Sequence, residues 1–381
     1  PEGIIVSQKK EDSKWGVKMV TPEEVDVLSH PVLLTSKKDY ESIKDKLSDN
    51  ICVYFDGIAK EKWSEKLNST EEKSIDEVLL QGAEIYESIL SKYGGTKNHN
   101  EILVYNYTGL GDAYVIAMLF ELYKKRNNNT NFILTTMSKA CRDVFRMFEI
   151  QNIELVTVDE SNALEKLALL CGANLYIKNL MQSPEYNPYI LRRFHGIRFN
   201  MFDMYQYYIF NLNNIDGLRR DFPSLRNSKG GIALCEEKGV EKGKSVIISP
   251  YAKSLVGFDK NIWKAIAASL IKSGLKVFTN CAENEKEIEG TTKISFPLTE
   301  AYCVIDYAGY FVGIRSGFCD VISETGAKKI LIYPDYNQFN GLGTYEFCSF
   351  ERMGFGKNYV EYKIKFEDGN KLPSIILNEI I

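Results

Sequence analysis

The chain has 381 residues, of which 44% are hydrophobic and 26% are charged, and its formal net charge is −4. This length suffices for two or three domains, each large enough to bury a core. The negative balance argues against a nucleic-acid binder that attaches through phosphate contacts, and no stretch reaches the roughly 18 apolar residues of a membrane-spanning helix.

Residues 1–95 are predicted to form an N-terminal extension, a small α/β appendage. Short apolar runs at 31–34 and 51–55 are typical of strands, and an amphipathic helical pattern over 40–47 lies between them. A longer helical pattern covers 71–93 and ends at two glycines.

From residue 100 onward, apolar strand patterns alternate regularly with helical patterns. The expected strands are 102–105, 132–135, 153–157 and 174–177, and the expected helices are 112–125, 139–148 and 161–170. This alternation predicts βαβ units and a parallel sheet, so we assign 96–230 to a Rossmann-like domain. Residues 181–226 interrupt the rhythm and are rich in aromatic, arginine and asparagine residues, which suits the lining of a cleft.

The stretch 227–244 is Gly-rich and charged, and we interpret it as the connection between domains. The rhythm then restarts, which predicts a second Rossmann-like domain over 245–381. Its expected strands are 246–249, 275–279, 292–295, 310–314 and 329–333, and its expected helices are 260–273, a short one from 283, 299–308 and 318–325. Two such domains across a cleft suit a nucleotide-bearing substrate better than a structural role.

The segment Thr-Gly-Leu-Gly-Asp at 108–112 joins the first strand of the first domain to its helix. Gly109 and Gly111 would let a ligand approach the backbone, and the helix start offers unpaired N–H groups to anions. The alternative is a tight turn with Asp112 as the N-cap. The third glycine of the dinucleotide fingerprint is missing, and no acidic residue closes the next strand, which argues against NAD binding.

The segment 249–254 follows the first strand of the second domain. It contains Ser249, Tyr251, Lys253 and Ser254, and we expect its lysine and hydroxyls to meet a diphosphate. The P-loop pattern is absent, and an exposed lysine in a loop is the alternative reading.

A second candidate phosphate site follows the strand 310–314. Ser316 and Gly317 would stand at a helix N-terminus, where the dipole and free N–H groups favour phosphate. Arg315 can donate a bidentate pair to phosphate, with a surface salt bridge as the alternative. Asp320 lies in the first turn, where it could also serve as a cap.

Two further groups are candidates for sugar or ribose contacts. Glu283 and Glu285 follow the strand 275–279 and could hold a ribose hydroxyl or act as acids at a helix start. The basic cluster of Arg193, His195 and Arg198 could bind an anionic or sugar acceptor, with a solvated face as the alternative.

The eight cysteines and three histidines predict neither a disulfide framework nor a zinc site. No two cysteines form a Cys-x-x-Cys pair, several lie inside apolar runs, and the histidines are widely spaced. We therefore expect reduced thiols, no metal and no cofactor. A cytoplasmic protein is expected, with the inner face of the membrane as an alternative location.

The order and spacing of the elements over roughly residues 100–335 resemble the GT-B glycosyltransferases, most closely the heptosyltransferase-like group, glycosyltransferase family nine. Those enzymes open their first domain with a strand, a Gly-Asp pair and a helix, and the aspartate of that pair is the proposed catalytic base. By position this is Asp112. The resemblance thus implies two Rossmann-like parallel-sheet domains of GT-B type, with the acceptor on the first and the donor on the second.

The second domain resembles the family at further places. The segment 249–254 and Trp263 take the place of a phosphate-binding loop and a Trp-containing helix, and Glu283 or Glu285 takes that of a nucleoside-binding glutamate. Where the family carries Asp-Thr-Gly-x-x-His at the donor phosphates, this chain has Arg-Ser-Gly-Phe-Cys-Asp over 315–320. The charge pattern around the donor is therefore inverted in order.

The resemblance implies an inverting, metal-independent transfer of a sugar from a nucleotide-diphosphate sugar to a glycan, lipid-linked or protein-linked acceptor, including peripheral association with a membrane. Asp112 would deprotonate the acceptor hydroxyl, while Lys253 and Arg315 would stabilise the leaving diphosphate. The chain has no Asp-x-Asp motif, which agrees with a metal-independent reaction. Two alternatives stay open: a nucleotide-sugar 2-epimerase of the same architecture, which needs no acceptor, and a non-catalytic sugar-binding subunit of a glycan assembly complex, which binds donor without turnover.

Overall fold

The computed structural model describes residues 3–5, 18–20, 32–34, 52–54, 75–95, 100–128, 131–171, 175–180, 200–212, 223, 228–253, 255–282, 284–339 and 342–381. The chain divides into two compact units, Pro1–Glu77 and Val78–Ile381.

The described part of the first unit contains two pairs of short parallel strands. β1 (Gly3–Ile5) pairs with β2 (Lys18–Val20), and β3 (Val32–Leu34) pairs with β4 (Cys52–Tyr54). The last two coincide with the apolar runs in which the sequence predicts strands. The helix expected over 40–47 lies outside the described residues.

A four-stranded parallel sheet with the order β7-β6-β5-β8 opens the second unit. Its strands are β5 (Asn100–Tyr105), β6 (Asn131–Thr136), β7 (Ile153–Leu155) and β8 (Ile177–Asn179). The helices of this half are α3 (Ile75–Lys92), α4 (Leu110–Arg126), α5 (Lys139–Met147) and α6 (Val158–Cys171). The βαβ rhythm expected from the sequence is confirmed.

Alternation along β5 sends side chains to two separate cores. Ile102 and Val104 pack on one face of the sheet with residues of α3 and α6, while Leu103 and Tyr105 pack on the other with α4 and α5. Helix α3, which lies in the range assigned to the appendage, thus contributes Tyr86, Ile89 and Leu90 to a core of this domain. Helix α4 is buried without interruption from residue 113 to 120, because it contacts α5, α12 and the segment η4.

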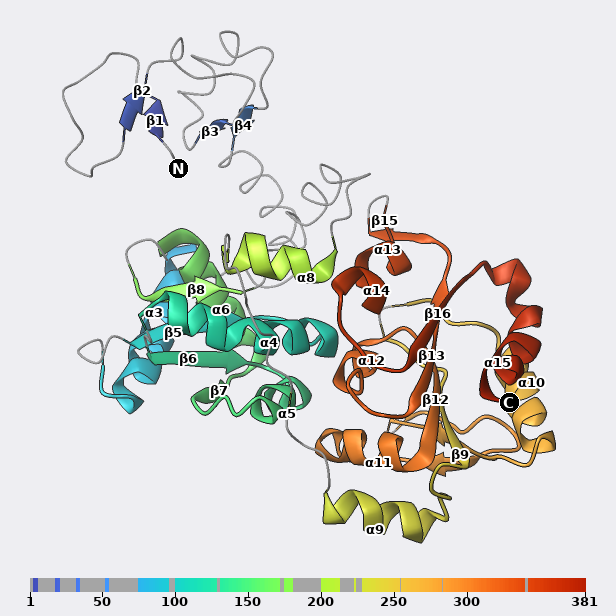
Figure 1. Ribbon diagram of the computed structural model, residues 1–381. Coiled ribbons are helices and arrows are strands. Elements are labelled where there is room, and N and C mark those ends of the chain that lie inside the picture. The colour runs from blue at the N-terminus through green and yellow to red at the C-terminus, as the bar shows by residue number, and fades with distance from the viewer. Residues whose placement is uncertain are drawn as a thin grey trace. The chain divides into compact units, whose positions relative to one another are not determined.

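The second sheet has six parallel strands in the order β11-β10-β9-β12-β13-β16. Numbered along the chain this is 3-2-1-4-5-6, the order of a doubly wound Rossmann-type sheet. The strands are β9 (Ser245–Ser249), β10 (Lys276–Asn280), β11 (Thr292–Ile294), β12 (Gly309–Ile314), β13 (Lys328–Pro334) and β16 (Tyr359–Ile364). In Figure 1, α10 (Lys260–Lys272) and α15 (Leu372–Ile380) lie on one side of this sheet, and α11 (Ala301–Ala308) and α12 (Gly317–Val321) lie on the other.

Shorter elements complete the described part of this unit. They are α8 (Met201–Asp203), the π-helix η4 (Met204–Ile209), α9 (Lys229–Lys238), the 3-10 helices η5 (Leu298–Glu300) and η6 (Phe366–Lys371), the antiparallel pair β14 (Asn337–Phe339) and β15 (Leu342–Gly343), α13 (Thr344–Cys348) and α14 (Phe350–Met353). None of the described helices is long and apolar enough to cross a membrane.

Three local expectations differ from the structure. The charged stretch 227–244 contains a helix, α9, because Ser228 caps it through Gly231 N at 3.1 Å and it packs on α11. Residues 284–291 form a turn and an irregular stretch in place of a helix. The helix expected over 318–325 ends at Val321, after which i to i+3 bonds such as that from Thr325 N to Ile322 O form a tight turn.

Candidate functional site

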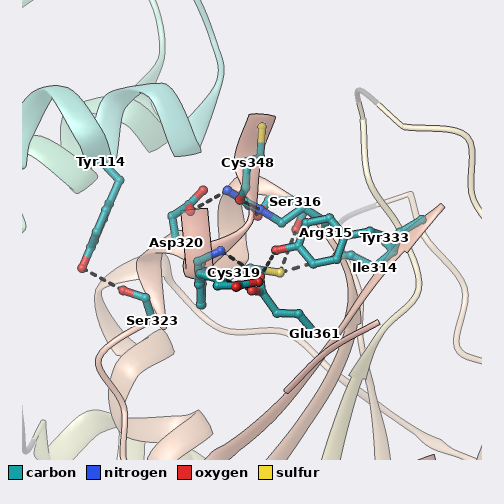
Figure 2. A network of polar contacts seen from close by, with 12 residues as sticks. Tyr114, Ile314, Arg315, Ser316, Cys319, Asp320, Ser323, Tyr333, Cys348 and Glu361 are labelled. Carbon is teal, nitrogen blue, oxygen red and sulfur yellow. Dashed lines mark hydrogen bonds and ion pairs between the residues drawn. The ribbon is translucent and has the colours of Figure 1, made fainter. Parts of the chain in front are cut away.

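The starts of α4 and α12 meet at the junction of the two Rossmann-like domains. Gly111 and Gly317 face each other so closely that a Cβ on Gly317 would overlap the backbone nitrogen of Gly111. A Cβ on Gly111 would likewise overlap Oδ2 of Asp320. Nearby, the hydroxyls of Tyr114 and Ser323 are 3.3 Å apart across the same junction, as Figure 2 shows. These glycines therefore allow two helices to approach, which is a packing requirement independent of any ligand.

Asp112 is the third residue of α4 and lies beside this junction. The N-cap of α4 is Gly109, so the reading of Asp112 as the N-cap does not hold. Its Oδ1 accepts a hydrogen bond of 2.8 Å from the hydroxyl of Tyr205. Burial raises the pKa of Asp112, while the Tyr205 hydrogen bond, a backbone hydrogen bond and the charge of Arg315 act in the opposite direction.

The loop before α4 is fixed by groups from the first domain. The hydroxyl of Tyr105 donates to the carbonyl of Gly109 at 2.6 Å, and the thiol of Cys141 lies 3.9 Å from the same oxygen. A Cβ on Gly109 would overlap Oδ2 of Asp112, so glycine at this place leaves room for the second carboxylate oxygen. The loop thus presents a carboxylate whose two oxygens have different surroundings.

Arg315 is buried, with 3% of its surface exposed, and forms an ion pair of 2.6 Å with Oδ1 of Asp320 (Figure 2). Its Nε donates to the carbonyl of Cys348 at 2.9 Å, and a further nitrogen donates to the carbonyl of Ser316. The guanidinium also lies over the ring of Phe350, 5.7 Å from its centroid. Because Arg315 is buried and each of its three nitrogens donates to an oxygen of the protein, we expect it to act by holding Asp320. The surface salt bridge considered for Arg315 is wrong because the pair is buried.

Asp320 is fully buried, and within the described part of the chain its Oδ2 has no hydrogen-bond partner. Burial raises the pKa of Asp320 to about 6, and the pairing with Arg315 opposes this rise. Ser316 and Gly317 are partly buried at the start of α12, which has five residues. Gly317 lies against Gly111 and Leu110 of α4.

A pocket of about 340 Å³ lies at the carboxyl ends of the adjacent strands β9 and β10. It is lined by the loop after β9, the start of α10 and the loop after β10, with the residues Pro250, Tyr251, Ala252, Lys253, Leu255, Gly257, Phe258, Lys260, Trp263, Glu285 and Ile288. Ligands of doubly wound sheets bind outside the carboxyl ends of strands. The structure thus brings together Tyr251, Lys253 and Glu285 of the predicted donor residues.

The pocket combines apolar walls with a few polar groups. Trp263 is 1% exposed, and its indole Nε1–H has no hydrogen-bond partner among the described residues, an unusual state for a buried donor. The hydroxyl of Tyr251 donates to the carbonyl of Lys286 at 2.5 Å, and Glu285 accepts from the amide of Ala282 at 2.7 Å. Lys253 is exposed at the pocket. Such a lining suits a planar apolar group that carries a negatively charged substituent.

Charged groups from both domains act on the thiol of Cys141 in α5. The pKa of this thiol is raised to about 11, mainly by burial and in part by the charge of Asp112, while hydrogen bonds to Ser138 and Tyr105 and the charge of Lys253 act in the opposite direction. Lys253 comes from the second domain, and Asp112 and Cys141 come from the first.

The remaining predicted residues are placed as follows. Ser249 is buried at the end of β9. Ser254, Glu283, Arg193, His195 and Arg198 lie outside the described residues. Within the described ranges, no group of three or more His, Cys, Asp or Glu side chains could hold a metal ion.

Two features of the site have no counterpart among the predicted residues. One is Tyr205, which lies 93 residues from its partner Asp112. The other is a polar network between the neighbouring strands β5 and β8. Asn106 donates to Glu165 at 2.7 Å and Asn179 donates to the same carboxylate at 3.2 Å, while Ser161 donates to Asn106 at 2.8 Å. Polar residues directly after apolar strands are the signal that could have identified Asn106 and Asn179.

No protein-family model matches this sequence, and no curated protein matches it. Solved structures do resemble it in fold. The E. coli ADP-heptose LPS heptosyltransferase II is 14% identical, with 74% of this chain and 97% of that chain covered and a TM-score of 0.50. A glycosyl transferase family 9 protein from Veillonella parvula is 13% identical, with 73% and 89% covered and a TM-score of 0.44. An E. coli heptosyltransferase solved with ADP-2-deoxy-2-fluoro heptose is 9% identical, with 74% and 98% covered and a TM-score of 0.46.

The fold is GT-B. Two parallel sheets with flanking helices, and the first of these likenesses, confirm the expected α/β class with two Rossmann-like domains.

Proposed function

We propose that the chain is a glycosyltransferase that moves a sugar from a nucleotide-diphosphate sugar to a hydroxyl of a glycan or glycoconjugate, with inversion and without a metal. One observation carries the proposal: the start of α4, which holds Asp112, meets the start of α12 directly after β12, and β12 pairs with β9, whose following loop lines the pocket. A candidate base thus lies close to a candidate donor pocket. The GT-B fold, shared with a structure described as an ADP-heptose heptosyltransferase, supports the same reaction class.

The donor is proposed to occupy the pocket of the second domain. Its nucleoside would lie against Phe258 and Trp263, with Glu285 as an acceptor for a hydroxyl. Its diphosphate would extend toward Lys253. A single lysine stabilises charge that develops on the leaving group without requiring a metal.

In the proposed reaction, the carboxylate of Asp112 accepts the proton of the acceptor hydroxyl while that oxygen forms a bond to the anomeric carbon. The bond between the anomeric carbon and the diphosphate oxygen breaks at the opposite face, and the diphosphate leaves with the electron pair. Lys253 stabilises the resulting negative charge. A base with a pKa raised by burial is better matched to this proton transfer than an exposed aspartate.

The acceptor is proposed to bind to the first domain. The network of Asn106, Glu165 and Asn179 presents amide and carboxylate groups, which are suited to sugar hydroxyls. A lipid-linked or protein-linked acceptor, the roles of Arg193 and His195, and peripheral association with a membrane stay predictions from the sequence.

A thermal-shift series with UDP, GDP, ADP and CMP sugars tests donor binding. A ligand that binds only the folded state raises the melting temperature with its occupancy, so one nucleotide should stand out. No shift with any of the four would contradict the proposal.

Lys253→Met is expected to weaken binding of the selected nucleotide sugar by roughly ten- to hundredfold, because one charge-assisted contact is lost. Lys272→Met, at an exposed lysine in the last turn of α10, is the matched control and should bind like the wild type. Titration calorimetry measures both. Equal affinities of the two variants would show that Lys253 does not contact the donor.

A further inference from the structure

The segment 200–209 reaches both domains. The side-chain amide of Asn200 donates to the backbone carbonyl of Arg352 in α14 at 2.8 Å, and α8 contacts α14. Five residues later, Tyr205 donates to Asp112 in α4 at 2.8 Å. One short stretch therefore ties the second domain to the candidate base of the first.

The backbone of this segment is unusual. Asn200 and Asp203 form a capping box at the start of α8, which continues directly into the π-helix Met204–Ile209. π-helical turns are rare and occur frequently at functional sites. Here the π-helix carries Tyr205, whose side chain is fully buried while Asp112 is only partly buried. The tyrosine thus supports the carboxylate from the interior.

We propose that Tyr205 is a positioning residue for Asp112, which fixes Oδ1 and leaves Oδ2 to accept the proton of the acceptor hydroxyl. This inference rests on the proposed function and adds a residue to its machinery. Oδ2 lies on the side of Gly109, where the missing Cβ leaves space. Tyr205 belongs to a segment that is hydrogen-bonded to α14 of the second domain through Asn200. Contacts between the two domains therefore help to fix the orientation of the Asp112 carboxylate.

The hydroxyl of Tyr205 acts as a permanent donor. Burial and the charge of Asp112 raise the pKa of Tyr205 well above its ordinary value, so the phenol stays protonated at working pH. Other ionisable groups that interact with Asp112 are Tyr105 of β5, Cys141 of α5, and Arg315, Asp320 and Cys348 of the second domain, and Tyr107 interacts with Tyr205. Tyr205 donates a hydrogen bond of 2.8 Å to the Asp112 carboxylate.

Tyr205→Phe is expected to move the acid limb of the kcat profile about one pH unit upward, because a hydrogen bond that favours the charged carboxylate is lost. At a pH well below the wild-type pKa of the acid limb, kcat of the variant should be about tenfold lower than that of the wild type, while the KM for the donor is unchanged. Tyr302→Phe is the matched control, since it removes another buried hydroxyl, which donates to the carbonyl of Glu324 at 2.6 Å. An acid limb that stays in place in Tyr205→Phe, or that moves equally in Tyr302→Phe, would overturn the inference.

A second measurement needs no sugar transfer. Because burial raises the pKa of Asp112 above its ordinary 3.8, the stability of the wild type relative to Asp112→Asn is highest at low pH and falls as the pH rises through the folded-state pKa. With Phe at position 205 in both proteins, this fall should occur at higher pH. If that variant does not fold, replacement of Tyr205 by 3-fluorotyrosine keeps a stronger donor in place and should move the fall to lower pH.

The two proposals can fail separately. Transfer activity combined with an unshifted titration of Asp112 would refute the role of Tyr205. A shifted titration in a chain that binds no nucleotide sugar would refute the proposed function and leave the link between Tyr205 and Asp112 intact.

Discussion

Asp112→Asn is expected to lower kcat for sugar transfer by about 10² to 10⁴-fold, the usual contribution of a positioned general base. Asparagine has nearly the same shape and can still accept from Tyr205, but it cannot take the proton of the acceptor hydroxyl. The proposed donor pocket lies in the second domain and is not lined by Asp112, so the affinity for the donor should stay at the wild-type value. Initial rates of nucleoside diphosphate release in the presence of acceptor measure the effect.

Asp159→Asn provides the control for Asp112→Asn. It removes a carboxylate from the same domain, at an exposed position in the first turn of α6. Its transfer rate should equal that of the wild type. Full activity in Asp112→Asn would show that another group is the base and that the start of α4 does not take part in the reaction.

Arg315→Met is expected to lower the free energy of unfolding by about 3–5 kcal/mol, because it leaves the carboxylate of Asp320 buried without its partner. The ion pair of 2.6 Å between the two side chains lies at the base of α12. The double variant Arg315→Met with Asp320→Leu should recover most of the loss, since both charges are then absent. Urea unfolding of the three proteins measures this, and a double variant as unstable as the single one would contradict it.

The same variant has a defined pH dependence. Burial already raises the pKa of Asp320 to about 6 in the wild type, so its contribution to stability is fully present below its ordinary 3.8 and is lost as the pH rises through 6. Without Arg315 the pKa should rise further. The loss of stability in Arg315→Met should therefore be larger at pH 8 than at pH 5, where the neutral carboxyl needs no counterion.

The sequence predicts the fold well where local patterns decide it. The apolar runs that become β5, β6, β9, β12 and β13 are short, are followed by small or polar turns, and alternate with helical patterns, and such features depend only on neighbouring residues. The helix in the charged stretch 227–244 was not predicted, because its stability comes from packing on α11 and from the Ser228 cap. The low intrinsic helix propensity of Gly230 and Gly231 points the other way.

The site is less accessible to sequence reasoning because it depends on long-range contacts. Arg315 follows an apolar strand in a manner that favours a ligand contact, yet its partner Asp320 and the carbonyl of Cys348 draw it into the interior. The bond between Tyr205 and Asp112 joins segments that no local pattern relates. By contrast, Lys253 and Glu285 follow adjacent strands of a parallel sheet, and for such residues the sequence predicts the shared pocket.

The most direct test is a crystal structure of the chain with the nucleoside diphosphate that the thermal-shift series selects. We expect the nucleobase in the pocket beside Trp263, the diphosphate within hydrogen-bond distance of Nζ of Lys253, and the terminal phosphate directed toward Asp112. A nucleotide bound elsewhere, or one whose phosphates point away from Asp112, would contradict the proposed transfer.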